Sequence, residues 1–369
     1  MIKRIFAYAL LSAGLVAVLV ITTSFNSGQS KADMIHLASN FNNGTSKISE
    51  TDKVTKPQFL QLVTSTPITG QTNVPLNTDI SLTFSKPLAA DTAIPVLNPP
   101  VSGDWTVVNS DTLLFTPAQE FFPFSVLSVT MPGGINGIKS VNSEYLAQTQ
   151  TMTLTFTDGT VLQLQQYLST LNYLPLTYNS STGAFSWNYA SVPSSLQALW
   201  QQGVYNEMTK AAVMTFEYQN GLAVDGIAGQ QVWDALASDL VSNKQNTFGY
   251  SYVMVSKVLP ENVQVWHNGQ IVFNTLANTG IPQAPTPNGT FAIYARYTST
   301  TMKGVNPNGT PYDDPNIPWV SYFNGGDALH GFIRASYGFP QSVGCVEMPF
   351  SSAQTVFGLT TYGTLVTVS

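Results

Sequence analysis

The residues best suited to chemistry lie near the C-terminus, where His330 and Cys345 are fifteen positions apart. Cys345 is the only cysteine in 369 residues, and His330 is one of three histidines. A thiol becomes a strong nucleophile when a neighbouring base favours its thiolate, and imidazole is the usual base. The intervening residues are apolar or turn-forming, as two strands and a connecting loop require. The pair therefore predicts nucleophilic catalysis by Cys345 with His330 as general base.

Glycines flank the pair, since Gly331 follows the histidine and Gly344 precedes the cysteine. A residue without Cβ lets the backbone approach a substrate closely. The amides of Gly344 and Cys345 could then donate to a developing oxyanion. The competing interpretation is structural, because a lone cysteine is often a small buried hydrophobe and a lone histidine an ordinary core residue.

The local pattern favours catalysis. His-Gly at residues 330–331 is followed by Ser-x-Gly-Cys-Val-x-Met at residues 342–348. This pattern resembles the active-site motif of the L,D-transpeptidase catalytic domain, a family that cross-links bacterial peptidoglycan through a cysteine acyl-enzyme. Upstream, Thr-Pro-Asn-Gly-Thr-Phe at residues 286–291 resembles the family's Thr-Pro-x-Gly-x-Phe segment. The resemblance covers residues 248–369 and implies a mostly β catalytic domain.

Two positions depart from the family pattern. Many members carry a second histidine where this chain has Val343, which leaves His330 as the only base. Many also carry Arg or Asn where this chain has Glu347. If residues 345–347 are extended, Glu347 and Cys345 project from the same side. Glu347 could then raise the pKa of the thiol and attract an acceptor amine. A solvated or locally paired carboxylate turned away from the site is the alternative.

The resemblance also implies a mechanism and further site residues. The donor would be a peptidoglycan stem tetrapeptide, and the amine of a second stem would resolve the thioester into a 3→3 cross-link. The carbonyl of Gly331 would orient the imidazole. Asp327 competes for this role, but strand alternation would place it on the opposite face from His330. Ser342 would shape the loop near the thiol, and Tyr322 and Glu347 are further candidates for substrate contact.

Other function classes fit less well. Cys/His peptidoglycan peptidases and amidases usually place cysteine before histidine, and sortases require an Arg after the cysteine, whereas no Arg follows Cys345. A wall-binding scaffold with a retired active site stays open because of Val343 and Glu347. We expect no cofactor and no metal, since three scattered His and one Cys cannot build a typical zinc site.

Composition narrows the environment. Only 9% of the residues are charged, and the net charge is −6. An acidic chain without clustered Lys and Arg is not typical of nucleic-acid binding. One cysteine allows no internal disulfide. The expected location is extracytoplasmic, at the cell wall.

The N-terminal segment indicates export. Lys3 and Arg4 precede an uncharged run over residues 5–21, which just reaches the minimum for a membrane span. Residues 1–30 are therefore interpreted as a membrane anchor, with a cleaved signal peptide as the alternative. Residues 31–56 are rich in Ser, Asn, Thr and Lys and are predicted to be a flexible linker.

Residues 57–158 contain short alternating runs, such as Ile80–Phe84 and Met152–Phe156, separated by turn residues. This spacing predicts an antiparallel sandwich. The segments at residues 66–75 and 82–87 resemble bacterial Ig-like domains, which implies a spacer.

Residues 159–241 change to helical periodicity. Val161, Leu164, Leu168 and Leu171 would share one helix face, and a second helix is predicted from Asn206 to Gln219. With Val-Asp-Gly-Ile-Ala-Gly at residues 224–229, the region resembles a peptidoglycan-binding domain. A small structural helical module is the alternative, and the long segment 176–205 has no assigned role.

Residues 248–369 return to strand alternation. Asn268-Gly269 between two alternating runs predicts a two-residue hairpin. Residues 298–318 are rich in Gly, Pro and Asn, and we interpret them as a long loop that could form a substrate lid. The fold class expected for the whole chain is therefore multidomain: an all-β Ig-like sandwich, a small α-helical module and a mostly β catalytic domain.

Overall fold

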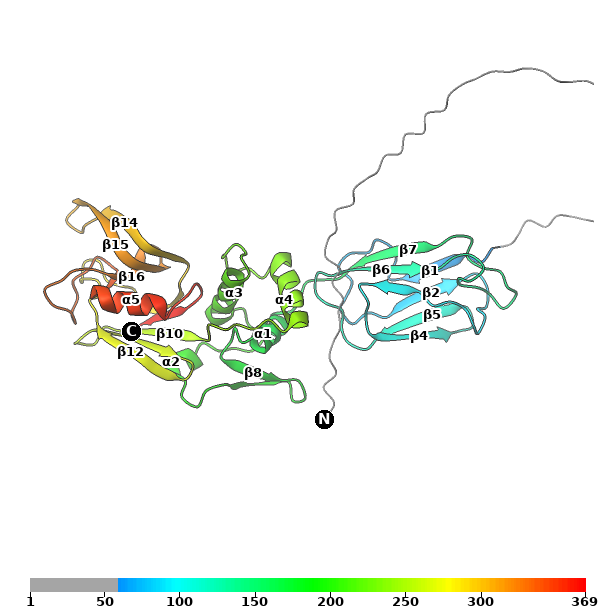
Figure 1. The fold of residues 1–369 in the computed structure, drawn as a ribbon, viewed down its shortest axis with the longest axis horizontal. Helices are drawn as coiled ribbons and strands as arrows, with labels where there is room; N and C mark the ends of the chain where they lie inside the picture. Colours follow the sequence, from blue (N-terminus) through cyan, green and yellow to red (C-terminus); the bar gives the residue numbers. More distant parts are fainter. Residues whose placement is uncertain (1–58) are drawn as a thin grey trace, which may run out of the picture.

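The computed structural model describes residues 59–369. The predicted membrane anchor at residues 1–30 and the linker at residues 31–56 lie outside this part. None of the helices formed by residues 59–369 has the length and apolar character that a membrane span needs. The described chain forms three successive bodies along one axis (Figure 1). We call them the sandwich domain (59–158), the helical module (159–241) and the C-terminal domain (250–369).

The sandwich domain consists of two antiparallel sheets, as predicted. One has the order β1-β2-β5-β4 and the other β3-β6-β7. In β2, Ile80, Leu82 and Phe84 are buried and the residues between them are not, so the alternation seen in the sequence marks the core face. The strands are β1 (Leu62–Thr66), β2 (Ile80–Phe84), β3 (Val96–Asn98), β4 (Gly103–Val108), β5 (Thr112–Pro117), β6 (Val126–Met131) and β7 (Gln150–Thr155).

The helical module contains the two predicted helices. In α1 (Val161–Thr170), Thr160 and Gln163 form a capping box. In α3 (Glu207–Gln219), Asn206 accepts from the amide of Thr209 as N-cap. Gly221, with φ +67°, follows its end, where a left-handed residue stops a helix. The module also holds α2 (Ser194–Gln197), α4 (Gln230–Ser242) and a hairpin of β8 (Leu176–Asn179) and β9 (Ala184–Trp187).

The C-terminal domain has two sheets and one helix. The five-stranded sheet has the order β12-β11-β10-β18-β13, and the four-stranded sheet has the order β14-β15-β16-β17. The predicted Asn268-Gly269 hairpin joins β11 to β12. The elements are β10 (Ser251–Ser256), β11 (Asn262–His267), β12 (Gln270–Leu276), β13 (Gly289–Ala292), β14 (Ala295–Val305), β15 (Pro311–Asn324), β16 (Asp327–Gly331), β17 (Val346–Met348), α5 (Phe350–Gly358) and β18 (Leu365–Val368).

The long loop predicted at residues 298–318 is wrong. Strands β14 and β15 pair as a long antiparallel hairpin over most of this range, and residues 306–310 form its tip. Gly304 packs against the ring of Tyr312, and Pro311 and Pro318 lie in β15. The Gly and Pro residues that indicated a loop are accommodated within the hairpin, where the ladder shifts register between Thr300 and Met302.

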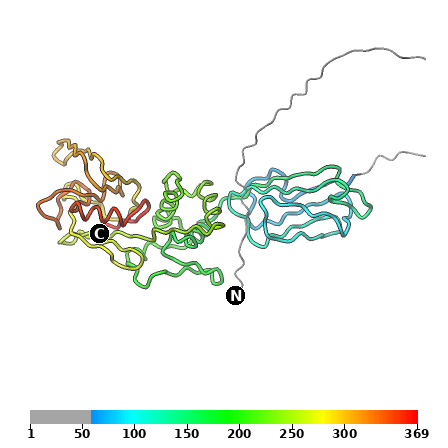
Figure 2. The backbone as a smooth tube through the Cα atoms, viewed as in Figure 1, coloured from blue at the N-terminus to red at the C-terminus, as the bar shows by residue number. Residues whose placement is uncertain are grey.

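The helical module and the C-terminal domain share one hydrophobic core. Trp266, Tyr252 and Leu365 of the C-terminal sheet are buried in the same cluster as Leu168 and Phe216 of the module. The sandwich core is a separate cluster. Figure 2 shows the chain running directly from the helical module into the C-terminal domain.

The segment 176–205 joins the two bodies. The indole of Trp266 donates to the carbonyl of Ser191 (2.9 Å), and the hydroxyl of Tyr252 donates to Ser195 (2.9 Å). The hydroxyl of Tyr189 donates to Asn268 (2.9 Å). These bonds hold the segment against the five-stranded sheet.

Candidate active site

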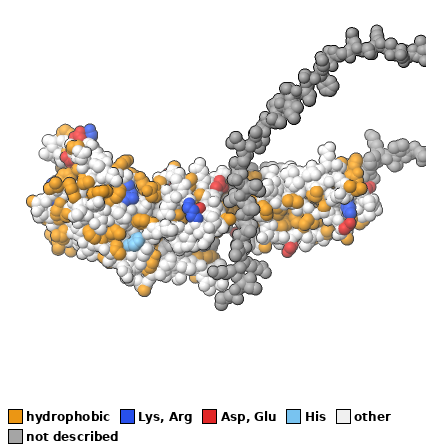
Figure 3. All heavy atoms as spheres, viewed as in Figure 1, with side chains coloured by type: hydrophobic (Ala, Val, Ile, Leu, Met, Phe, Trp, Pro, Cys, Tyr) orange, Lys and Arg blue, Asp and Glu red, His pale blue; other side chains and the backbone are white. Residues whose placement is uncertain are grey.

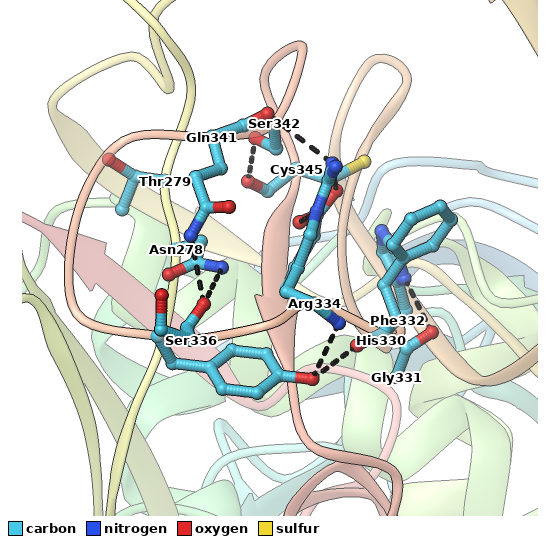
Figure 4. Close-up of polar contacts among 12 residues, drawn as sticks. Asn278, Thr279, His330, Gly331, Phe332, Arg334, Ser336, Gln341, Ser342 and Cys345 are labelled. Atoms are coloured by element: carbon cyan, nitrogen blue, oxygen red, sulfur yellow. Dashed lines mark hydrogen bonds and ion pairs between the residues drawn. The ribbon is translucent and has the colours of Figure 1, made fainter.

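Two parallel strands position His330 and Cys345. In the β16–β17 ladder, His330 pairs with Glu347 and Leu329 with Val346. Paired residues of a parallel ladder share a face, and Cys345 precedes Glu347 by two residues, so Cys345 and His330 face the same side. Ideal strand rise and spacing would separate their Cα atoms by about 8 Å if the extended chain includes Cys345. Among the described residues, the hydrogen-bond partner of the thiol is the carbonyl of Gly326, not the imidazole. Figure 4 shows both side chains on the same side of this part of the sheet.

The imidazole of His330 is buried and has a defined tautomer. Its Nδ1 lies 3.0 Å from the carbonyl oxygen of Gly331. Because a carbonyl only accepts, Nδ1 carries the proton and donates, which leaves Nε2 as the free base. Burial lowers the pKa of His330, although the Gly331 carbonyl opposes this shift. The hydrogen bond that the resemblance implies for Gly331 is present.

The carboxylate of Asp327 contacts groups other than the imidazole of His330. Its carboxylate accepts from the side-chain amide of Asn324 (3.2 Å). Burial raises the pKa of Asp327, and the bond from Asn324 opposes this. The carboxylate also lies against Gly344, the residue before the cysteine. Asp327 therefore acts on the thiol side of the site.

The thiol of Cys345 is partly accessible, and its Sγ lies 3.7 Å from the carbonyl oxygen of Gly326. Burial raises the pKa of the thiol, the amide of Ala328 lowers it, and the charges of Asp327 and Glu347 raise it further. A raised thiol pKa and a lowered imidazole pKa favour the neutral forms of both groups at rest. The geometry therefore favours proton transfer during attack over a resting ion pair.

Gly344 cannot be replaced without strain. Its φ is +112°, and a Cβ built on it would lie 2.3 Å from Oδ1 of Asp327. Its carbonyl accepts from the hydroxyl of Thr286 (2.7 Å), so the Thr-Pro-x-Gly-x-Phe segment supports the loop before the cysteine. Outside the strand ladders of residues 59–369, no backbone carbonyl accepts the amide hydrogen of Gly344 or Cys345. Both amides can therefore donate to an oxyanion.

Ser342 holds the other side of this loop. It is buried, and its hydroxyl donates to the carbonyl of Cys345 (2.5 Å). Its backbone amide donates to the carbonyl of Thr279 (3.0 Å). Ser342 thus fixes the backbone of the cysteine. Val343, at the position of the second family histidine, is exposed.

Glu347 is buried and paired. Its two carboxylate oxygens accept from Nε (2.7 Å) and Nη2 (2.8 Å) of Arg334. The guanidinium also lies over the ring of Phe332, 4.7 Å from the ring centre. Glu347 is thus a locally paired carboxylate in this structure. Contact between Glu347 and an acceptor amine stays a prediction.

Sequence reasoning missed several residues of this site. Arg334 belongs to the loop between β16 and β17, and no short-range pattern links it to Glu347. Asn278 is buried and exchanges two backbone hydrogen bonds with Glu347, each 2.9 Å. The hydroxyl of Tyr337 accepts from the amide of Arg334 (3.2 Å) and donates to the carbonyl of Phe332 (2.6 Å). Together they fix the loop that carries Arg334 (Figure 4).

The β14–β15 hairpin borders the thiol. Tyr322 packs in one small apolar cluster with Cys345 and Phe332. Burial raises the pKa of Tyr312 in β15, and the charge of Cys345 raises it further. Within the described part of the chain, no group of three or more His, Cys, Asp or Glu is arranged to hold a metal ion.

Family comparisons agree with this geometry. Residues 250–368 match the L,D-transpeptidase catalytic domain family. Residues 194–236 match a peptidoglycan binding domain family, and residues 55–158 match a bacterial Ig-like domain family. The three resemblances seen in the sequence are confirmed. The second match begins at residue 194, so α1 and the β8–β9 hairpin lie outside it.

Solved structures also match. The catalytic domain of an Enterococcus faecium (E. faecium) L,D-transpeptidase is 28% identical, covers 32% of this chain and 96% of its own, and has a TM-score of 0.30. An L,D-transpeptidase from Mycobacterium smegmatis is 11% identical, and the match covers 85% of this chain and 100% of that chain, with a TM-score of 0.30. L,D-transpeptidase 3 from Mycobacterium tuberculosis is 11% identical, covers 84% and 98%, and has a TM-score of 0.29. No curated protein matches the chain significantly.

The family matches support a cell-wall L,D-transpeptidase with peptidoglycan as partner. The matched domains act on peptidoglycan, which indicates an extracytoplasmic location at the cell wall.

Proposed function

We propose that this chain cross-links peptidoglycan through an acyl-enzyme on Cys345, with His330 as general acid and base. The observation that carries the proposal is the hydrogen bond from Nδ1 of His330 to the carbonyl of Gly331. This bond leaves Nε2 basic, and the pairing of His330 with Glu347, two residues after Cys345, supports proton exchange between the imidazole and the thiol. The match of residues 250–368 to the L,D-transpeptidase family supports the reaction class.

Acylation begins with both groups neutral. Nε2 of His330 takes the thiol proton as Sγ attacks the carbonyl of the third residue of a donor stem tetrapeptide, and a C–S bond forms. The amides of Gly344 and Cys345 donate to the oxyanion. The imidazolium returns its proton to the leaving nitrogen as the C–N bond breaks, and D-alanine departs.

Transfer reverses these roles. The side-chain amine of a second stem attacks the thioester carbonyl, a C–N bond forms and the C–S bond breaks. His330 accepts the proton that the amine loses and returns it to the sulfur. The product is a 3→3 cross-link and a free thiol, so the enzyme is regenerated without a cofactor.

The surrounding residues position the reacting groups. Ser342 fixes the backbone of Cys345 through its 2.5 Å bond to the carbonyl, and Arg334 neutralises Glu347 beside the thiol. Without Arg334, the anion at position 347 would raise the pKa of the thiol further. Tyr322, in the cluster around Cys345, would contact the bound stem. The N-terminal run at residues 5–21 would hold the enzyme at the membrane, with the sandwich domain as spacer.

The test is muropeptide analysis after the full chain is incubated with purified sacculi. We expect new 3→3 cross-links with the wild type and none with Cys345→Ala or His330→Gln. His267→Gln is the matched control, because His267 lies in β11 and contacts Ser251 instead of the thiol loop. Cross-links formed by Cys345→Ala would contradict the proposal. Absence of cross-links with a folded wild type that still sediments with sacculi would favour the scaffold alternative.

A further inference from the structure

We propose that the hollow between the helical module and the C-terminal domain binds the acceptor stem, as a peptide that carries both an ammonium group and a carboxylate. This inference rests on the proposed function and specifies where the second substrate of that reaction is held. The catalytic family match begins at residue 250, so the helical side of this hollow lies outside it.

The hollow has the size of a ligand site. Its volume is about 470 Å³, within the range of small-molecule pockets. One wall is a face of α3, and the other wall is formed by β13 and by the turn that follows β15. The residues that line it from α3 are Glu207, Lys210 and Met214, and those from the C-terminal domain include Thr290, Tyr294 and Asn324.

Two opposite charges in this hollow have no side-chain partner among residues 59–369. Glu207 and Lys210 are three residues apart on α3, a spacing at which Glu and Lys side chains often pair. Among the described residues, neither forms an ion pair or a side-chain hydrogen bond. Charged side chains are scarce on this protein, at 9% of its residues, and Figure 3 shows few on the visible face. An unpaired acid and base facing one hollow fit a ligand with both charges.

The peptidoglycan-binding signature supports Lys210. A Cβ on Gly226 would lie 2.8 Å from Cγ of Lys210, so the lysine stem packs directly on this glycine. Gly226 has φ +69°, and its amide donates to the buried carboxylate of Glu217 (2.9 Å). The Val-Asp-Gly segment of the module thus forms the support on which Lys210 reaches the hollow.

The wall opposite α3 suits an extended chain. β13 is an edge strand that pairs only with β18. An edge strand presents unpaired backbone groups, to which an extended peptide can add. A sugar chain lacks the backbone amides that would pair with such an edge.

The hollow leads toward the thiol. Asn324 and Gly325 line it, and the next residue, Gly326, places its carbonyl 3.7 Å from Sγ of Cys345. Asn324 also donates to Asp327, whose carboxylate lies against Gly344. A peptide bound between α3 and β13 would therefore approach the acyl-enzyme from the side of the β15–β16 turn.

Binding to the full-length Cys345→Ala chain tests the inference without turnover. The probe is a stem tetrapeptide with a free side-chain amine and a free C-terminal carboxylate, titrated by calorimetry at low salt. Loss of one charge-assisted contact corresponds to about tenfold weaker binding. We expect this loss for Lys210→Ala and for Glu207→Gln. Lys139→Ala, in the sandwich domain, is the matched control and should bind as the parent does.

Chemical variants of the probe identify the contacts. A probe with a C-terminal amide should bind the parent chain weakly, and its affinity should not fall further with Lys210→Ala. A probe with an acetylated side-chain amine should likewise bind the parent weakly, and its affinity should not fall further with Glu207→Gln. Unchanged affinity in both protein variants would overturn the inference. Equal binding of a peptide-free disaccharide would also overturn it, in favour of a sugar site. Acylation of the wild-type chain by a β-lactam is measured separately, and its failure would count against the proposed function alone.

Discussion

The C-terminal domain and the sandwich domain both adjoin the helical module, but they contact it in different ways. The C-terminal sheet shares a buried core with the module, including Trp266 and Tyr252. The sandwich domain keeps its own core and reaches the module through the partly buried rings of Phe122 and Phe124. Residues 159–369 therefore form one folded unit, called the catalytic unit after its proposed function, and the sandwich domain is a separate body attached to it.

The largest expected effect comes from truncating one buried aromatic residue in each body. Trp266→Ala should destabilise the catalytic unit by about 3–5 kcal/mol and abolish β-lactam acylation near its new melting temperature, because it removes a side chain from the shared core. Phe115→Ala should cost a similar amount in the sandwich domain and leave acylation unchanged. Calorimetry should resolve two transitions, each shifted by one variant. A joint shift of both transitions would show that the bodies unfold as one.

Ion pairs offer a second comparison between the two bodies. The Glu side chain is 6% exposed in the Arg334–Glu347 pair and 18% exposed in the Lys86–Glu144 pair, while the basic side chain is 30% exposed in both. Glu347→Gln should cost roughly 2 kcal/mol, since it leaves Arg334 without its anion. It should also quicken acylation, because the charge of Glu347 raises the pKa of the thiol. Glu144→Gln should cost less than about 1 kcal/mol.

Urea unfolding and acylation rates measure both effects. The double variant Arg334→Met with Glu347→Gln should recover part of the lost stability, because no unpaired charge remains. If Glu347→Gln changed the free energy of unfolding and the acylation rate as little as Glu144→Gln does, the buried Arg334–Glu347 pair would not contribute more than the Lys86–Glu144 pair.

A smaller effect concerns pH. Burial raises the pKa of Glu217 to about 7, above its ordinary value of 4.5. The folded state therefore holds a proton that the unfolded state has lost between pH 4.5 and 7, and stability falls as pH rises through this window. The loss reaches up to about 3 kcal/mol at pH 8. Glu217→Gln keeps an oxygen for the amides of Asp225 and Gly226 and should remove this dependence.

Melting temperatures between pH 5 and 8 would check this effect. In the wild type, the melting temperature of the catalytic unit should fall as pH rises. The melting temperature of the sandwich domain should not show this effect of Glu217. In Glu217→Gln, the melting temperature of the catalytic unit should depend less on pH. An unchanged slope in Glu217→Gln would assign the dependence to other groups.

Local patterns could predict much of this architecture. The Asn268-Gly269 hairpin and the ends of α3 depend on turn and capping residues that act over a few positions. The hydrogen bond from His330 to Gly331 joins adjacent residues, and the family motif pointed to it. The paired strands β16 and β17 then place the thiol on the same face.

The missed features depend on contacts between distant segments. Arg334 meets Glu347 across a loop of thirteen positions, and only the folded chain brings them together. The β14–β15 hairpin contains Gly304, Pro311 and Pro318, whose residue types indicate turns although pairing with the neighbouring strand overrides this preference. The shared core was hidden because Trp266 and Tyr252 look like ordinary strand residues until the helical module covers them.

Intact mass spectrometry of the full chain with a carbapenem, over a range of pH, tests most directly whether Cys345 is the nucleophile. We expect one covalent adduct, located by peptide mapping on Cys345, and none with Cys345→Ala. The rate should fall as pH drops below the ordinary imidazole value, because burial lowers the pKa of His330 and protonation there removes the base. His330→Gln should remove this dependence and most of the rate. An adduct that persists in Cys345→Ala, or a wild-type chain that forms none, would contradict the proposal that Cys345 is the nucleophile.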